Sequence, residues 1–254
     1  MLRYGRIIQV REPPEAFGID TAWGGYVPHD DHWDTNSRCS MTPIDWAETG
    51  KTPAHGLIVP YIRRALADTK ASTVADYACL DDGLATQQYD VHLSNKLVLF
   101  DNRVVPELAN HYMAVDYAEQ FWEPYVAHVG IAAMLLDRLG LDTYGHILDP
   151  KADTIALRNI WRTIKPKGTL IVIVPASMGD IIRCCRRAYS PRSLPRLVGT
   201  VVNGKYDMTF FTYHRDAWWQ CNEYEVQEAP DDRIINIAAI TLTKGEGNGS
   251  NGRH

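Results

Sequence analysis

Three aspartates stand at or near the ends of short apolar runs, where carboxylates could contact a ligand. They are Asp76 in residues 72–77, Asp101 at the end of residues 96–101, and Asp116 at the end of residues 112–116. Ligands of open α/β sheets gather beyond the carboxyl ends of the parallel strands. An aspartate there can accept hydrogen bonds from ligand hydroxyl groups, or it can simply cap the next helix.

A second concentration of polar side chains lies at residues 29–34, His-Asp-Asp-His-Trp-Asp. Histidine and aspartate at this density could bind a divalent cation. Adjacent side chains diverge on either a strand or a helix, however, and no second cluster accompanies them. We therefore expect no metal site and predict that this segment is a polar loop covering a site.

The elements that would position these residues alternate between strand and helix. Apolar residues at helical spacing predict helices over 57–66 and 153–164. Residues 169–175 are apolar without alternation, as in a strand buried on both faces of a parallel sheet. Strands are also expected at 206–213 and 234–243, and these two could pair antiparallel. The alternation predicts a doubly wound α/β domain.

A fourth strand is expected at residues 124–131, where it merges into an amphipathic run over 132–139 whose type is left open. Residues 1–68 are expected to form an N-terminal lid or cap, because aromatic and turn-forming residues dominate an irregular sequence. The α/β domain would span 69–244. The Gly/Asn/Ser-rich residues 245–254 would form a disordered tail.

Composition limits the function classes. The 254 residues are 45% hydrophobic and 22% charged, with a formal net charge of -5, which argues against a nucleic-acid partner. No run approaches the roughly 20 apolar residues that span a bilayer, so no membrane partner is expected. The five cysteines lack metal-ligand spacing. We expect a cytoplasmic protein that acts on a small molecule and could form a homodimer.

The segment 156–175 resembles the helix, turn and fifth strand of class I S-adenosylmethionine (SAM) methyltransferases. Its turn would be Lys165-Pro166-Lys167-Gly168. Pro166 fixes φ, and Gly168 is expected to adopt a positive φ.

The segment 74–86 resembles the glycine-rich first motif of the same family. Asp76 matches the acid and Tyr77 the hydrophobic residue that follows it. Ala78 and Leu80 stand at two of the glycine positions, and Gly83 remains. The resemblance implies a Rossmann-like, seven-stranded sheet.

A narrower resemblance, over residues 70–243, is to an uncharacterised methyltransferase-related family. The matching pieces are His128–Gly130, Tyr144-Gly145, Asp149-Pro150, Val174-Pro175 and the Arg187-Ala188-Tyr189 triplet. Ala127 stands where the family has Glu, and Arg186 where it has His. This resemblance supports the fold and carries no reaction with it.

The resemblance implies SAM as the cofactor, bound at the carboxyl ends of the first three strands. The implied cofactor-binding residues are Asp76, Tyr77, Ala78, Cys79, Gly83, Asp101, Asn102, Asp116 and Tyr117. Asp76 would lie near the amino-acid part of SAM, and Asp101 would accept hydrogen bonds from the two ribose hydroxyls. Asp116 and Tyr117 would flank the adenine.

Two histidines are candidates for a catalytic base. His128 is expected to follow the fourth strand, where the acceptor would face the sulfonium, and His146 is the weaker candidate. Each could equally be a structural histidine.

Three functions remain open from the sequence. The first is a SAM-dependent methyltransferase acting on a small-molecule or sugar-like acceptor. The second is a non-catalytic methyltransferase-like scaffold or regulatory partner, favoured by Ala78 and Leu80 in glycine positions. The third is a cyclase or lyase on the same fold.

Overall fold

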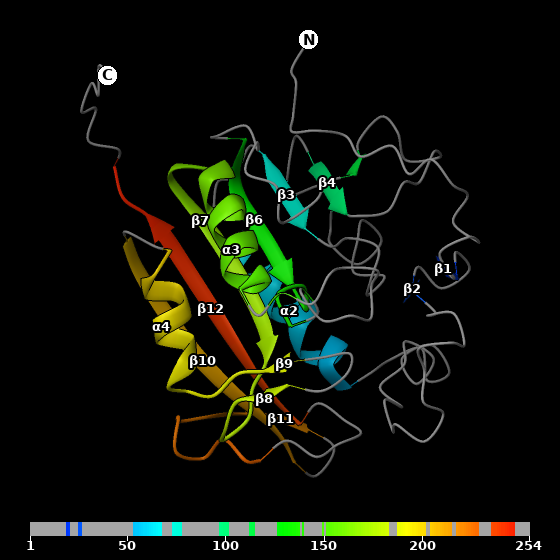
Figure 1. Ribbon diagram of the computed structural model, residues 1–254, viewed down its shortest axis with the longest axis vertical. Coiled ribbons are helices and arrows are strands. Elements are labelled where there is room, and N and C mark those ends of the chain that lie inside the picture. The colour runs from blue at the N-terminus through cyan, green and yellow to red at the C-terminus, as the bar shows by residue number, and fades with distance from the viewer. Residues whose placement is uncertain are drawn as a thin grey trace.

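The computed structural model describes residues 19–20, 25–26, 53–67, 73–77, 97–101, 112–114, 126–137, 139, 149, 151–182, 187–201, 204–214, 217–228 and 235–246. Most of them belong to one mixed sheet with helices on both faces (Figure 1). Two short antiparallel pairs of strands form separate small sheets. One joins β1 (Ile19–Asp20) to β2 (Gly25–Tyr26), and the other joins β8 (Ile181–Ile182) to β9 (Arg187–Ala188).

Five parallel strands form one half of the main sheet. In spatial order they are β5 (Tyr112–Ala114), β4 (Leu97–Asp101), β3 (Val74–Tyr77), β6 (Ala127–Ala133) and β7 (Ile164–Pro175). The strands predicted near residues 72–77, 96–101, 112–116 and 124–131 are therefore confirmed. Their carboxyl ends share one edge of the sheet.

The other half of the sheet is antiparallel. β12 (Asn236–Lys244) pairs antiparallel with both β7 and β10 (Gly204–His214), which confirms the predicted pairing of the last two expected strands. β11 (Ala217–Cys221) returns along β10 and forms the edge. Within the described residues the sheet has eight strands, so the expected count of seven is not confirmed.

Helices cover the sheet on opposite faces. α3 (Ala152–Thr163) and α4 (Ser193–Gly199) pack on one face through buried residues such as Leu157 and Leu194. α2 (Pro53–Ala67) packs on the other face, where Ile58 and Ile62 join Ile131 in a second core cluster (Figure 1). The helix predicted over 57–66 is thus confirmed, and it packs on the sheet.

β7 is the central strand of this core. Residues 170–175 are all buried, because successive side chains enter the two core clusters in turn. This confirms the prediction of a strand covered on both faces. None of the described helices is long and apolar enough to cross a membrane.

The expected turn at Lys165–Gly168 lies inside β7 as a bulge. Ala127 pairs with Ile164 and Val129 with Thr169, so an advance of two residues along β6 corresponds to an advance of five residues along β7. The expected positive φ is at Lys167, with φ 63°, instead of Gly168. Gly168 is required for space, since a Cβ there would lie 2.7 Å from the carbonyl oxygen of His128.

Of the run over 132–139, the structure describes residues 132–137 and 139. Ala132 and Ala133 complete β6, and residues 134–137 form a bend and a turn. Residues 29–34 and the tail from 247 lie outside the described residues.

Candidate functional site

The order of the parallel strands defines the place where a ligand would bind. From β3 the chain passes to β4 and β5 on one side and then returns to β6 on the other side of β3. The sheet therefore has a topological switch point between β3 and β6. Open α/β sheets bind ligands in the crevice outside the carboxyl ends of the strands at such a point. The two strand ends that border it are Tyr77 and Ala133, and Asp101 ends β4, the next strand beyond β3.

Asp76 brings a carboxylate to this edge. It is the third of the four residues of β3, lies in register with Leu99 and Ile131, and is only 2% exposed. Because side chains alternate along a strand, Asp76 lies on the face of Val74, which belongs to the core cluster of α2. A buried carboxylate beside a switch point is a strong candidate for a ligand contact.

Tyr77 points to the opposite face. Its side chain is wholly buried, and its hydroxyl group is hydrogen bonded to that of Thr163 at the end of α3. Burial, with a smaller contribution from Asp76, raises the pKa of Tyr77 well above its usual value. The Tyr77 side chain is therefore committed to the core, so only its backbone could face a cofactor.

Asp101 is the last residue of β4 and pairs with Ala114 of β5. Its position is one step beyond Phe100, the register partner of Tyr77. An acid about 20 residues after the first strand typically binds the ribose hydroxyls in dinucleotide-binding sheets. The backbone thus has Asp101 at the edge where the sequence predicts it.

The other implied cofactor residues lie outside the described residues, and they stay predictions. They are Ala78, Cys79, Gly83, Asn102, Asp116 and Tyr117. The candidate base His146 also lies outside them.

The predicted position of His128 is wrong. His128 is the second residue of β6, and its backbone N–H donates to the carbonyl oxygen of Thr73 at 3.0 Å, at the amino end of β3. Ala133 lies five positions further along the strand, or about 16 Å. Burial first, and Lys165 second, lower the pKa of His128. His128 therefore belongs to the amino edge, away from the switch point.

The backbone turns sharply where β6 ends. Met134 follows the last residue of the strand, has φ 52° and is fully buried. Its N–H donates to the carbonyl oxygen of Ile173 on β7 at 2.8 Å. Long side chains rarely adopt a positive φ, and such strain concentrates at functional sites. The sequence gives no signal for this turn, because it reads as a continuous apolar run.

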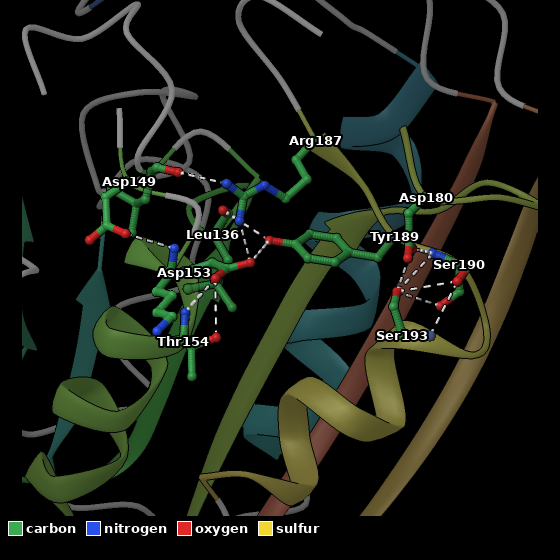
Figure 2. A network of polar contacts seen from close by, with 11 residues as sticks. Leu136, Asp149, Asp153, Thr154, Asp180, Arg187, Tyr189, Ser190 and Ser193 are labelled. Atoms are coloured by element: carbon green, nitrogen blue, oxygen red, sulfur yellow. Dashed lines mark hydrogen bonds and ion pairs between the residues drawn. The ribbon is translucent and has the colours of Figure 1, made fainter. Parts of the chain in front are cut away.

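A buried polar network lies next to this turn, and sequence reasoning did not predict it (Figure 2). Arg187 forms an ion pair with Asp153 of α3, and the hydroxyl of Tyr189 lies 3.0 Å from the same carboxylate oxygen. The other oxygen of Asp153 accepts from the backbone N–H of Thr154 at 2.6 Å. In the sequence, the only signal at Arg187 and Tyr189 is the Arg187-Ala188-Tyr189 triplet, which implies no role for either residue.

A second polar cluster fixes the start of α4. The hydroxyl of Ser193 and the backbone N–H of Ser190 donate to Asp180 at 2.5 and 2.7 Å (Figure 2). Burial alone would raise the pKa of Asp180, but these hydrogen bonds lower it below its usual value. The cluster therefore stabilises the N-terminus of α4.

Neither a scan against protein-family models nor a search of curated proteins finds a match. Among solved structures the chain is similar to a SAM-dependent methyltransferase from Archaeoglobus fulgidus, with 11% identity, a TM-score of 0.49, and coverage of 79% of this chain and 98% of that chain. It is also similar to the 1,6-didemethyltoxoflavin-N1-methyltransferase of Burkholderia thailandensis, solved with 1,6-didemethyltoxoflavin and S-adenosylhomocysteine. That match has 14% identity, a TM-score of 0.48, and coverage of 80% and 84%.

A third similar structure is the N-methyltransferase NodS of Bradyrhizobium japonicum in complex with S-adenosylhomocysteine. It has 12% identity, a TM-score of 0.44, and coverage of 86% of this chain and 94% of that chain. Since these TM-scores are below 0.5, the fold assignment rests on strand order and register. These give the chain a Rossmann-like α/β sheet with a switch point between β3 and β6.

Proposed function

We propose that the protein is a SAM-dependent methyltransferase acting on a small-molecule or sugar-like acceptor. The observation that carries the proposal is the pair of aspartates at the carboxyl ends of β3 and β4, beside the switch point. Asp76 lies buried near the end of β3, and Asp101 ends the neighbouring strand β4. This arrangement fits a nucleoside whose ribose hydroxyls need an acceptor at the second strand.

The chemistry of these residues fits SAM. The carboxylate of Asp101 would accept hydrogen bonds from the ribose hydroxyls, and Asp76 would lie toward the ammonium group in the amino-acid part of the cofactor. When bound, SAM supplies an electrophilic methyl group. The protein would mainly hold the acceptor in line with that group, since positioning alone can remove a large part of a transfer barrier.

The acceptor class follows from charge and position. A formal net charge of -5 disfavours a polyanionic nucleic acid as acceptor. His128 is not proposed as the base, because it lies at the amino edge of the sheet. A proton acceptor, where the acceptor atom needs one, would have to come from the carboxyl edge.

Calorimetry with SAM and S-adenosylhomocysteine tests the proposal. Either ligand, at about 100 times its dissociation constant, should stabilise the fold by ~2.7 kcal/mol. Asp101→Asn should weaken binding while the unfolding midpoint without ligand stays unchanged. Asp207→Asn is the matched control, since Asp207 is exposed on β10. Its binding should equal that of the wild type.

A second function is favoured by a specific feature of the sequence. Ala78 and Leu80 occupy two glycine positions of the cofactor loop, and each adds a side chain where the family has none. If neither SAM nor S-adenosylhomocysteine binds at millimolar concentration, the methyltransferase proposal fails and a non-catalytic, methyltransferase-like scaffold takes its place. Binding of SAM without transfer to any acceptor would instead favour another reaction on the same fold.

A further inference from the structure

Two residues from a distant part of the chain hold the segment that follows β6. The hydroxyl of Tyr189 shares its proton between the carbonyl oxygen of Leu136 and the carboxylate of Asp153, each at 3.0 Å (Figure 2). The backbone N–H of Arg187 donates to the carbonyl oxygen of Asp137 at 2.8 Å, and its Nη2 donates to that of Leu139 at 3.4 Å. Three carbonyl groups within four residues are thus bound from residues 187–189.

The two donor residues are themselves fixed. The guanidinium of Arg187 is paired with Asp153, and both side chains are buried. The backbone N–H of Tyr189 donates to the carbonyl oxygen of Pro175 at 3.1 Å, which attaches it to the end of β7. Burial first, and Asp153 second, raise the pKa of Tyr189 well above its usual value, so its hydroxyl keeps the proton that it donates.

The segment held in this way borders the proposed crevice. Residues 134–137 and 139 follow directly after β6, which forms one side of the switch point with β3. The positive φ of Met134 marks the sharp turn with which the chain leaves the strand. The course of the backbone after β6 therefore decides the shape of one wall of the crevice.

A buried ion pair adds little stability compared with apolar side chains of similar volume. The side chains of Arg187 and Tyr189 therefore matter chiefly for geometry, since they bind the carbonyl groups of Leu136 and Leu139, which apolar side chains could not do. An apolar replacement would remove these two donors, while the backbone N–H of Arg187 would still bind the carbonyl of Asp137.

We infer that Arg187 and Tyr189 are positioning residues of the cofactor- and acceptor-binding crevice. They act through Leu136, Asp137 and Leu139, and they touch neither ligand. The inference rests on the proposed function, because it assigns the segment to the same crevice.

Tyr189→Phe tests the inference, because it removes one hydroxyl group and keeps the ring. Amide hydrogen exchange in residues 134–139 should accelerate, while exchange in β7 and β12 stays unchanged. The dissociation constant for S-adenosylhomocysteine should rise about tenfold, as expected if only a tenth of the molecules keep the competent arrangement. Arg187→Lys keeps the charge but cannot donate in the same way to both the Asp153 carboxylate and the Leu139 carbonyl. It should therefore also raise the dissociation constant for S-adenosylhomocysteine.

Tyr61→Phe is the matched control. It also removes a tyrosine hydroxyl bonded to a threonine, Thr241, at 3.2 Å, but on α2 and outside the network. Its affinity for S-adenosylhomocysteine should equal that of the wild type.

The outcomes separate the two proposals. If the wild type binds the ligand and Tyr189→Phe binds it equally well, the positioning role is overturned while the proposed function stands. If the wild type binds neither SAM nor S-adenosylhomocysteine, the proposed function fails, and the positioning role in that crevice fails with it. Unchanged hydrogen exchange in residues 134–139 would also overturn the positioning role, whatever the ligand result.

Discussion

The hydroxyl groups of Tyr77 and Thr163 meet in a buried hydrogen bond across 86 positions of sequence. Thr163 donates its own proton to the carbonyl oxygen of Ile160 at 2.7 Å, so Tyr77 is the donor in the pair. The bond joins the last residue of β3 to the last residue of α3. It therefore fixes the helix relative to the strand that carries the candidate site.

Tyr77→Phe should lower the free energy of unfolding by about 1 kcal/mol, since it removes one buried hydrogen bond and leaves the ring in place. Urea denaturation followed by fluorescence measures the change. Tyr206→Phe serves as the control, because Tyr206 is exposed on β10, and its cost should stay below about 0.5 kcal/mol. Equal effects of the two changes would contradict the role assigned to the bond.

Asp153→Asn should be far more costly than Asp149→Asn. Asp153 neutralises the buried guanidinium of Arg187, and breaking such a pair leaves an uncompensated charge that costs about 3 kcal/mol or more. Asp149 is only half-buried and accepts one hydrogen bond, from the backbone N–H of Lys151 at 2.8 Å. Its change should cost about 0.5 kcal/mol. Chemical denaturation of both variants gives the comparison, and similar costs would argue against an ionic contact.

Gly168→Ala should destabilise the fold by about 2 kcal/mol, the scale of overpacking in a closed site. A Cβ at this position would lie 2.7 Å from the carbonyl oxygen of His128 and 2.8 Å from that of Lys165, and backbone atoms cannot rotate away. Gly179→Ala is the control, since no atom lies within 4 Å of its added Cβ. Thermal unfolding of the two variants side by side measures the difference, which should be lost if the bulge can open freely.

Lys244 gives the fold a predicted dependence on alkaline pH. Its Nζ donates to the carbonyl oxygens of Trp161 and Ile164 at 2.8 and 2.7 Å. Burial first, and Arg162 second, lower the pKa of Lys244 to about 8, from an ordinary value of 10.5. Between these two values the unfolded chain binds the proton and the folded chain does not. The contribution of Lys244 to the free energy of unfolding should therefore rise with pH across this window.

A comparison with Lys244→Met isolates this effect, because the other titrating groups cancel in the difference. The difference in unfolding free energy between wild type and variant should be flat below pH 8 and should rise toward pH 10.5. A difference that falls over this range would show that the folded state favours the charged amine.

The elements that could be predicted were those with strong local patterns. The helical spacing of Ile58 and Ile62 and the unbroken apolar run of residues 170–175 reflect burial on one and on two faces, and both were confirmed. The place of His128 could not be predicted in the same way. His128 is fixed near the start of β6 by its contact with Thr73 and by the pairing of its neighbour Val129 with Thr169, and both partners lie far away in sequence.

The site was predictable only where it depends on strand ends. Asp76 and Asp101 are placed by the apolar runs that precede them. The pairing of Arg187 with Asp153 spans 34 positions, and it depends on how the chain returns to the end of β7. No local pattern encodes such a contact, and the Arg187-Ala188-Tyr189 triplet does not predict which residues it binds.

The bulge in β7 also determines where the chain can change in length. Ile164 and Thr169 are both tied to β6, while the four residues between them protrude from the ladder. One residue gained or lost there would alter the size of the protrusion and leave both anchors in register. The same change after Thr169 would exchange the residues facing α3 with those facing α2 along the whole strand. Residues 165–167, which are not buried, are thus the part of β7 where an insertion or deletion can be absorbed without disturbing the two core clusters, whereas the closely packed Gly168 must be kept.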